Sequence, residues 1–292
     1  MGGRRPGGPY VPRKPRSYEE EDASSGATMR ATLVIPTLNE AEGIGRTLAT
    51  FRAAAEEANR SLFLKSPVEW EILVVDGAST DGTAEIATRL GAKVILEKRK
   101  GYGRAYKTGF EQATGDYVAT LDGDGTYPAE MVPWFLLHLL HHQKDFLTGD
   151  RLTYLAPKSM TTEHRIGNFM LNFLIGVFFH SCLQGAPARI LVDSQSGFWV
   201  FRRTALASMR LTSDGMALSE EIKLEAMIRG LKFEEVPIHY AERWGRPKLS
   251  SWRDGLHNMT FLVRKRFQMS QENRLARRVP VAKASSSPQG PA

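Results

Sequence analysis

The sequence predicts an α/β fold with a mostly parallel sheet and helices on both faces, a Rossmann-like arrangement. Short β-branched runs alternate with amphipathic stretches of helical length through the first half of the chain. Three of the first four apolar runs end at Pro or Asp, as strands do where they give way to turns. Strands that alternate with helices in this way are typical of parallel sheets, because each crossover helix returns the chain to the same edge.

The bounds of the expected elements follow from where the apolar runs stop. In the first half, strands are expected over residues 31–35, 71–75, 92–96 and 117–121, and helices over residues 39–57, 80–90 and 103–113. Small polar residues open these helices, where they accept hydrogen bonds from unpaired backbone N–H groups. In the less regular second half, helices are expected over residues 161–183 and 219–229, and strands over residues 197–202 and 233–240.

Composition sets the domain organisation. Residues 1–28 and 269–292 are rich in Pro, Ser, Gly and charged residues, so we expect two disordered tails around one folded domain at 29–268. The net charge of +7 suits phosphorylated ligands, an anionic membrane or nucleic acid, without choosing among them. The single cysteine excludes an intramolecular disulfide. No apolar run reaches the ~20 residues that a membrane-spanning helix needs.

Polar residues follow three of the four predicted strands in the first half. They are Pro36, Asn39 and Glu40 after the first strand, Asp76 and Asp81 after the second, and Asp122 and Asp124 after the fourth. Ligands of parallel α/β sheets bind beyond the carboxyl ends of the strands. We therefore expect these residues to converge on one cleft.

Asp122 and Asp124 are the candidate metal ligands. Two carboxylates separated by one glycine follow an apolar strand, and Mg²⁺ or Mn²⁺ prefers such hard oxygen ligands together with substrate phosphates. A plain surface turn is the alternative for this triplet, because Asp and Gly are common turn residues.

The three strand-end segments, in this order, resemble the family 2 glycosyltransferases of GT-A fold over about residues 30–250. The resemblance implies a nucleotide diphosphate-sugar donor and a Mg²⁺ or Mn²⁺ ion held by Asp122 and Asp124. Residues 100–105 are similar to the glycine-containing loop of that family that lies along the donor. The resemblance assigns six residues to donor binding: Pro36, Asn39, Glu40, Asp76, Asp81 and Gly103.

The second half resembles the polyprenyl-phosphate branch of this family, which includes the dolichyl-phosphate transferases. The similar segments begin at Gly149, Asp193 and Tyr240. The resemblance assigns Arg151, Arg165 and Asp193 to catalysis beside Asp122 and Asp124, and Gln195, Arg243 and Lys248 to the acceptor. A phosphate acceptor is already ionised, so it needs cations to hold it rather than a base.

The expected activity is transfer of a sugar to a polyprenyl phosphate by one in-line displacement, with inversion at the anomeric carbon. The expected location is cytoplasmic and peripheral, at the inner or cytosolic membrane face. Contact with the membrane surface is assigned to residues 169–179 or 256–267, or to a separate membrane protein partner. For residues 169–179, packing in the core is the favoured alternative, because apolar helical stripes are usually buried.

Three other functions remain open at this point. A family 2 glycosyltransferase that acts on a sugar or metabolite hydroxyl would use Glu220 or Glu221 as base, although acidic residues also favour a helix N-terminus. A nucleic-acid-binding module is less favoured, because the cations are dispersed and no nucleic-acid motif is present, so no nucleic acid partner is expected. A catalytically silent scaffold is disfavoured by the retained pair Asp122 and Asp124.

Overall fold

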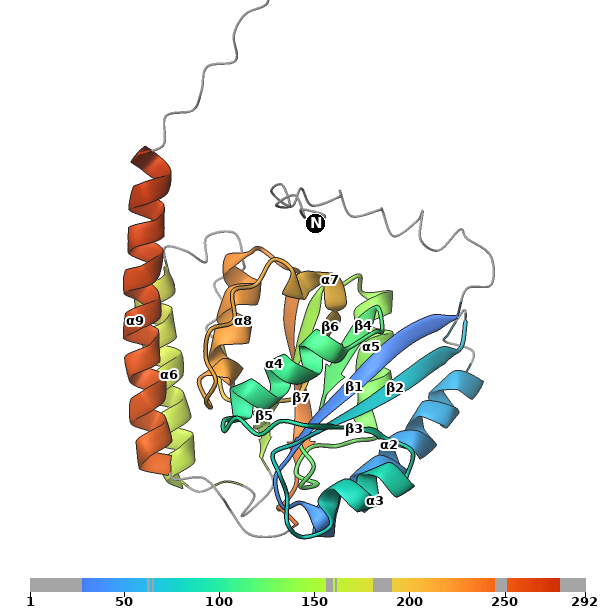
Figure 1. Cartoon of the computed structure of the whole chain (residues 1–292). Helices are drawn as coiled ribbons and strands as arrows, with labels where there is room; N and C mark the ends of the chain where they lie inside the picture. The colour runs from blue at the N-terminus through green and yellow to red at the C-terminus, as the bar shows by residue number, and fades with distance from the viewer. Residues whose placement is uncertain are drawn as a thin grey trace, which may run out of the picture.

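The computed structural model describes residues 28–61, 64, 66–155, 160, 162–180, 191–244 and 251–278. These residues contain a seven-stranded sheet with the strand order β3-β2-β1-β4-β6-β5-β7. Helices cover both faces of this sheet (Figure 1).

The strands are β1 (Met29–Thr37), β2 (Val68–Asp76), β3 (Lys93–Leu96), β4 (Tyr117–Thr120), β5 (Phe146–Leu155), β6 (Trp199–Arg202) and β7 (Phe233–Tyr240). The helices are α2 (Ala41–Arg60), α3 (Thr83–Arg89), α4 (Tyr102–Gln112), α5 (Met131–His141), α6 (Thr162–Phe179), α7 (Arg203–Leu206), α8 (Leu218–Ile228) and α9 (Ser251–Arg278).

The pairing of the strands confirms a mostly parallel sheet. β1 pairs in parallel with β2 and β4, β2 pairs in parallel with β3, and β5 pairs in parallel with β7. Only β6, among the described strands, runs antiparallel to its neighbours β4 and β5. The carboxyl ends of β1, β2 and β4 therefore lie at one edge of the sheet.

The apolar runs form the central strands because both faces of the sheet are buried. On β1, Leu33 and Ile35 pack into the core on one face, while Val34 packs into the core on the other. A third core joins α6 to α9 through residues such as Leu171 and Leu262. No helix within the described residues is long and apolar enough to cross a membrane.

Two expectations need correction. β5 was not predicted, because Gly149, Asp150 and Arg151 interrupt its apolar pattern, and its register shifts between Asp150 and Tyr154. The predicted tail 269–292 begins inside α9, which continues to Arg278. Residues 269–278 include Leu, Ala, Gln, Glu and Arg, which extend a helix already started at little cost. Residues 1–27 and 279–292 lie outside the described residues.

Candidate active site

The loops after β1 and β2 are joined by a network around Asp76. The Asp76 side chain is buried and accepts hydrogen bonds from Thr37 Oγ1 at 3.0 Å and from Ser79 N at 2.8 Å. Asn39, at a φ of 53°, accepts a hydrogen bond at Oδ1 from Thr80 N at 2.8 Å. These contacts fix the two strand ends against each other.

Asp81 is held by the same pair of loops. Its carboxylate accepts hydrogen bonds from Ala41 N at 3.0 Å and from Thr83 N at 3.1 Å. Glu40 N donates to Thr83 Oγ1 at 2.8 Å. Burial opposes ionisation of Asp81, but these hydrogen bonds outweigh it and hold its pKa below the ordinary value. The Asp81 carboxylate therefore braces the start of α2.

The turn that contains Asp122 and Asp124 packs against the start of α2. A Cβ atom added to Gly43 would lie 2.5 Å from Gly123 O, and one added to Gly123 would lie 3.5 Å from Glu40 Cβ. Only glycine at position 43 allows so close an approach. The strand-end residues of β1, β2 and β4 thus lie close together, as expected. Pro36 is partly buried within β1, where it pairs with Val75 of β2.

Asp122 is partly buried and lies beside two aromatic hydroxyl groups. Tyr106 donates to Asp122 Oδ1 at 3.1 Å, and the Tyr102 hydroxyl is 3.5 Å from the same atom. Burial, together with the charge of Asp124, raises the pKa of Asp122 to about 7. A divalent cation would relieve this repulsion, so the paired carboxylate oxygens fit a hard metal ion.

Asp124 is connected to the segment after β7. Its carboxylate accepts hydrogen bonds from Thr126 N at 3.0 Å and Thr126 Oγ1 at 2.6 Å, and it forms an ion pair with Arg243. Trp244 N donates to Asp124 O at 2.9 Å. The Arg46 guanidinium lies 4.4 Å from the centre of the Trp244 ring. The predicted acceptor residue Arg243 therefore contacts a predicted metal ligand.

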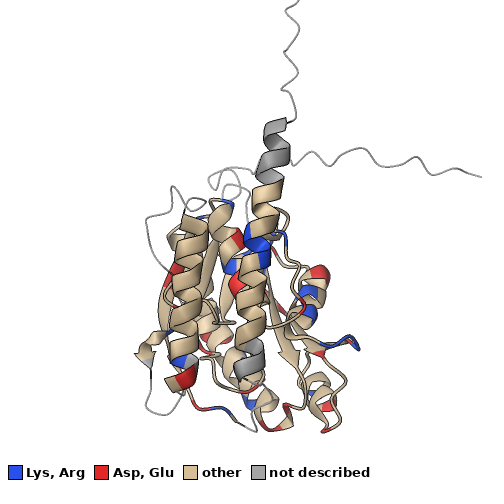
Figure 2. Ribbon diagram, turned by 90° about the vertical axis from the view of Figure 1, so that its left-hand side faces the viewer, with Lys and Arg blue, Asp and Glu red and all other residues tan. Residues whose placement is uncertain are grey.

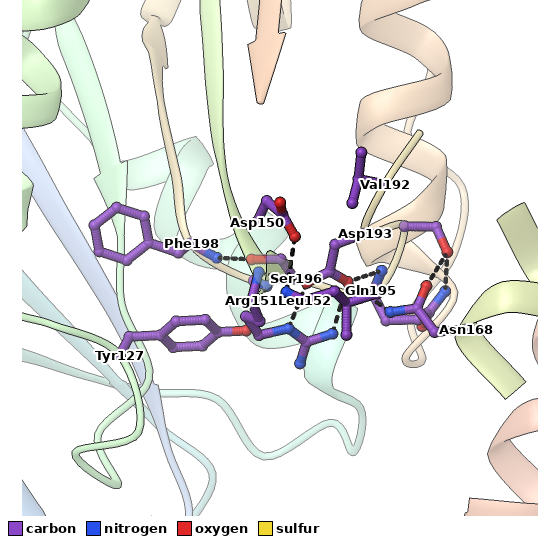
Figure 3. A network of polar contacts seen from close by, with 12 residues as sticks. Tyr127, Asp150, Arg151, Leu152, Asn168, Val192, Asp193, Gln195, Ser196 and Phe198 are labelled. Carbon is purple, nitrogen blue, oxygen red and sulfur yellow. Dashed lines mark hydrogen bonds and ion pairs between the residues drawn. The ribbon is translucent and has the colours of Figure 1, made fainter. Parts of the chain in front are cut away.

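Arg151 and Asp193 form a buried pair (Figure 3). Arg151 Nε donates to Asp193 Oδ2 at 2.7 Å, and Nη2 donates to Oδ1 at 2.8 Å. Burial of Asp193 opposes its ionisation, yet the Arg151 guanidinium holds the pKa of that carboxyl well below its usual range. The fork-to-fork geometry fixes the direction of Arg151.

Several side chains fix the loop that carries Asp193. Asn168 on α6 donates to Asp193 Oδ1 at 2.7 Å, and Lys223 on α8 donates to Asp193 O at 2.5 Å. Glu235 on β7 accepts from Asp193 N at 3.1 Å. Burial lowers the pKa of Lys223 to about 8. Elements far apart in the sequence thus hold Arg151 in place.

Gln195 joins α8 to α9. Its Nε2 donates to Glu220 Oε2 at 3.0 Å, and its Oε1 accepts from Asn258 at 2.8 Å. The other carboxyl oxygen of Glu220 is buried without a hydrogen-bond partner among the described residues, and burial raises the pKa of Glu220 well above its ordinary value. Glu221 is bound by Thr212, Ser213 and Lys265.

Three predicted site residues lie apart from these contacts. Arg165 is exposed on the first turn of α6, one turn before Asn168. Lys248 lies outside the described residues. Gly103 faces the backbone of another loop, because a Cβ atom there would lie 2.7 Å from Ser213 O. Their assigned roles remain predictions.

Several side chains that support the candidate site were not predicted from the sequence. One of them is Tyr106, which contacts Asp122. The others are Asn168 and Lys223, which both contact Asp193. One signal was present for the tyrosines, since Tyr102 and Tyr106 are four residues apart and so share a face of α4. Neither Asn168 nor Lys223 stands in a motif.

The mostly parallel sheet carries acidic residues at its carboxyl edge, which is where α/β proteins of this type bind their ligands. The sequence model of "Glycosyl transferase family 2" matches residues 32–209, and the chain belongs to this family. The predicted resemblance to family 2 glycosyltransferases of GT-A fold is confirmed.

Several proteins of Haloferax volcanii are similar to this chain. A "Low-salt glycan biosynthesis hexosyltransferase" is 36% identical over 243 residues, which cover 82% of this chain and 55% of that protein. A "Dolichyl-phosphate hexose transferase" is 33% identical over 227 residues, which cover 76% of this chain and 88% of that protein. The chain thus spans little more than half the length of the first relative.

Solved structures of glucosyl-3-phosphoglycerate synthase from Mycobacterium tuberculosis share the fold. One, in complex with Mn²⁺, uridine diphosphate and glucosyl-3-phosphoglycerate, has a TM-score of 0.59 and 20% identity, and covers 87% of this chain and 86% of that chain. Another, in complex with Mg²⁺ and uridine diphosphate, has a TM-score of 0.59 and 19% identity. It covers 87% of this chain and 84% of that chain. At this identity the likeness shows the fold alone.

Proposed function

We propose that this glycosyltransferase moves a hexose from a nucleotide diphosphate-sugar to a polyprenyl phosphate at a membrane surface. The observation that carries the proposal is the buried fork between Arg151 and Asp193. A guanidinium held in one orientation suits a phosphate group. The dolichyl-phosphate hexose transferase among the relatives supports this acceptor.

Each group of residues has one role in the proposal. Residues at the ends of β1 and β2, Asp76 above all, bind the nucleoside. Asp122 and Asp124 would hold Mg²⁺ or Mn²⁺, which would neutralise charge on the leaving diphosphate. Arg151 holds the acceptor phosphate in line with the anomeric carbon, and Asp193 orients Arg151. The displacement inverts that carbon.

The environment of the two glutamates on α8 favours a phosphate acceptor over a hydroxyl acceptor. A hydroxyl needs a base, whereas the Glu221 carboxylate is occupied by Thr212, Ser213 and Lys265. The raised pKa of Glu220 favours its neutral form, which cannot accept a proton. The proposed transfer to a phosphate therefore needs no protein base.

Transfer to a sugar or metabolite hydroxyl is the second candidate. The observation that favours it is the buried oxygen of Glu220, which has no hydrogen-bond partner among the described residues and could act as the base. A base contributes about 10²–10⁴ in rate. Glu220→Gln keeps the shape of the side chain, so its effect separates the two functions. We expect less than a tenfold loss of transfer to polyprenyl phosphate.

The direct test supplies the purified chain with a panel of uridine and guanosine diphosphate-sugars, Mg²⁺ or Mn²⁺, and a short polyprenyl phosphate. The proposal requires a glycosylated polyprenyl phosphate that depends on the metal. Transfer only to a hydroxyl acceptor, with loss of that transfer in Glu220→Gln, would support the second candidate instead.

A further inference from the structure

The outer side of α6 carries a continuous apolar stripe. Its exposed members are Ile166, Phe169, Met170, Phe173 and Val177. Their spacing of three or four residues places them along one side of the helix. The other side packs into the third core through Leu171 and Ile175. α6 is therefore apolar on both sides, and only one side is covered by the described residues.

A second stripe lies on α9, which packs beside α6 (Figures 1 and 2). Leu256, Val263 and Phe267 are exposed along it, and Leu256 and Val263 line a shallow hollow with Met259. Of the 13 exposed large apolar side chains in the described residues, eight lie on these two helices. The stripes therefore form one patch, which we call the α6–α9 face.

The charges around the α6–α9 face are mostly positive. Arg264 is exposed on α9, and Arg165 is exposed on the first turn of α6. Glu163 is the one acidic side chain that the structure describes within residues 162–180 and 255–271. Figure 2 shows the blue positions of α9 near mid-height and the almost uncharged ribbon of α6. The face is thus apolar with cations beside it.

We infer that the α6–α9 face docks on a membrane that contains anionic lipid, with its apolar stripes among the head groups. The cations complement anionic head groups. A second copy of the chain fits less well, because a two-fold interface would bring the same arginines together. The inference rests on the proposed function and names the surface through which it operates.

The position of α6 connects this surface to the candidate active site. Asn168 and Asn172 extend from α6 to the loop that holds Asp193, and Asp193 orients Arg151. The first turn of α6 lies at the same end of the molecule as the carboxyl ends of β1 and β2 (Figure 1). Docking of this face places the bilayer beside the arginine that would hold the acceptor phosphate.

Flotation of the whole chain with lipid vesicles tests the inference. We expect binding to phosphatidylcholine vesicles that contain phosphatidylglycerol. The double variant Phe169→Ser with Phe173→Ser should weaken this partition about tenfold or more, since each buried Phe favours the lipid. Arg264→Gln should weaken it about fivefold, on the anionic vesicles only.

Leu96→Ser is the matched control. Leu96 is 57% exposed on the edge strand β3, close to the values of 70% for Phe169 and 61% for Phe173, and we expect no loss of vesicle binding. Circular dichroism of each variant verifies the fold. The inference is overturned if the double variant partitions to the vesicles as the wild type does. It is also overturned if the wild-type chain does not bind the vesicles that contain phosphatidylglycerol.

Two further measurements separate the other outcomes. Analytical ultracentrifugation detects a second copy: a wild-type dimer that the double variant dissociates, without vesicle binding, overturns the lipid assignment. Transfer to a short water-soluble polyprenyl phosphate without vesicles tests the proposed function by itself, and the double variant should keep the wild-type rate there. If the wild type transfers sugar to the water-soluble acceptor but does not bind vesicles, only the docking face is refuted. If it binds vesicles but transfers no sugar, only the proposed function is refuted.

Discussion

At the scale of single residues, the candidate site is a set of carboxylates whose charges are balanced in different ways. Asp193 is balanced by Arg151, and Asp124 by Arg243. Asp122 has hydroxyl groups around it and the charge of Asp124 beside it. Asp122, one of the two predicted metal ligands, is thus the carboxylate whose ionisation its burial and its neighbour Asp124 oppose.

Asp124→Asn should remove metal-dependent transfer. The amide keeps the shape of the side chain but loses the charge that holds a divalent cation, and loss of one such electrostatic contact costs about 100-fold or more in kcat. Rates with Mg²⁺ or Mn²⁺ measure the effect, and urea unfolding verifies the fold. A variant that transfers sugar at the wild-type rate would exclude Asp124 as a metal ligand.

The buried Lys223 predicts a specific pH dependence of stability. Its pKa is about 8 in the folded chain, against about 10.4 in an unfolded chain. Between these values the unfolded chain binds more protons, so the free energy of unfolding rises with pH. Below pH 8 both states are protonated, and the contribution is constant.

Lys223→Met removes this titration. From pH 8 to pH 10 the wild type should gain stability relative to the variant, by up to about 3 kcal/mol. Urea unfolding at several pH values measures the difference. Parallel curves for the two proteins across this range would contradict the lowered pKa.

At the scale of elements, motifs that are continuous in sequence could be predicted and contacts between distant elements could not. Asp122 and Asp124 stand together after an apolar run, so the sequence reveals them. Arg151 and Asp193 are 42 positions apart in the sequence. Their contact depends on β5, which was not predicted because polar residues interrupt its apolar pattern. α6 has apolar residues on both its buried and its exposed side, so its sequence does not distinguish the buried Leu171 from the exposed Phe169.

The start of α2 predicts an effect of glycine substitution. Gly43→Ala would place Cβ 2.5 Å from Gly123 O, so α2 or the turn that contains Asp122 and Asp124 must shift. We expect a loss of about 1–3 kcal/mol in the free energy of unfolding, as for other overpacked sites, together with weaker Mn²⁺ binding.

Gly45→Ala on the same helix is the control. Its Cβ would lie 3.6 Å from Ile86, an ordinary contact, and alanine favours a helix by up to about 1 kcal/mol over glycine. We expect unchanged or higher stability and unchanged Mn²⁺ binding. Urea unfolding and titration calorimetry compare the two variants, and an equal effect of both would contradict the close approach at Gly43.

At the scale of the whole molecule, the chain returns from one edge of the sheet to its centre. β7 is an edge strand, yet the residues after it reach the turn that follows β4, three positions away in the strand order. Ala241 N donates to Thr126 O, and Arg243 pairs with Asp124. The candidate metal site therefore connects β4, near the centre of the sheet, to the segment that follows the edge strand β7.

Because the site joins both halves, binding of donor product and metal should stabilise the whole fold. A ligand that binds only the folded state at 100 times its Kd adds about 2.7 kcal/mol to the free energy of unfolding. We expect Mn²⁺ with uridine or guanosine diphosphate to raise the midpoint of urea unfolding, and more than either component by itself. In Asp124→Asn the metal-dependent part of this increase should disappear while the nucleotide-dependent part persists, because Asp76 and its loop are unchanged. An equal increase in both proteins would mean that the metal binds elsewhere on the chain.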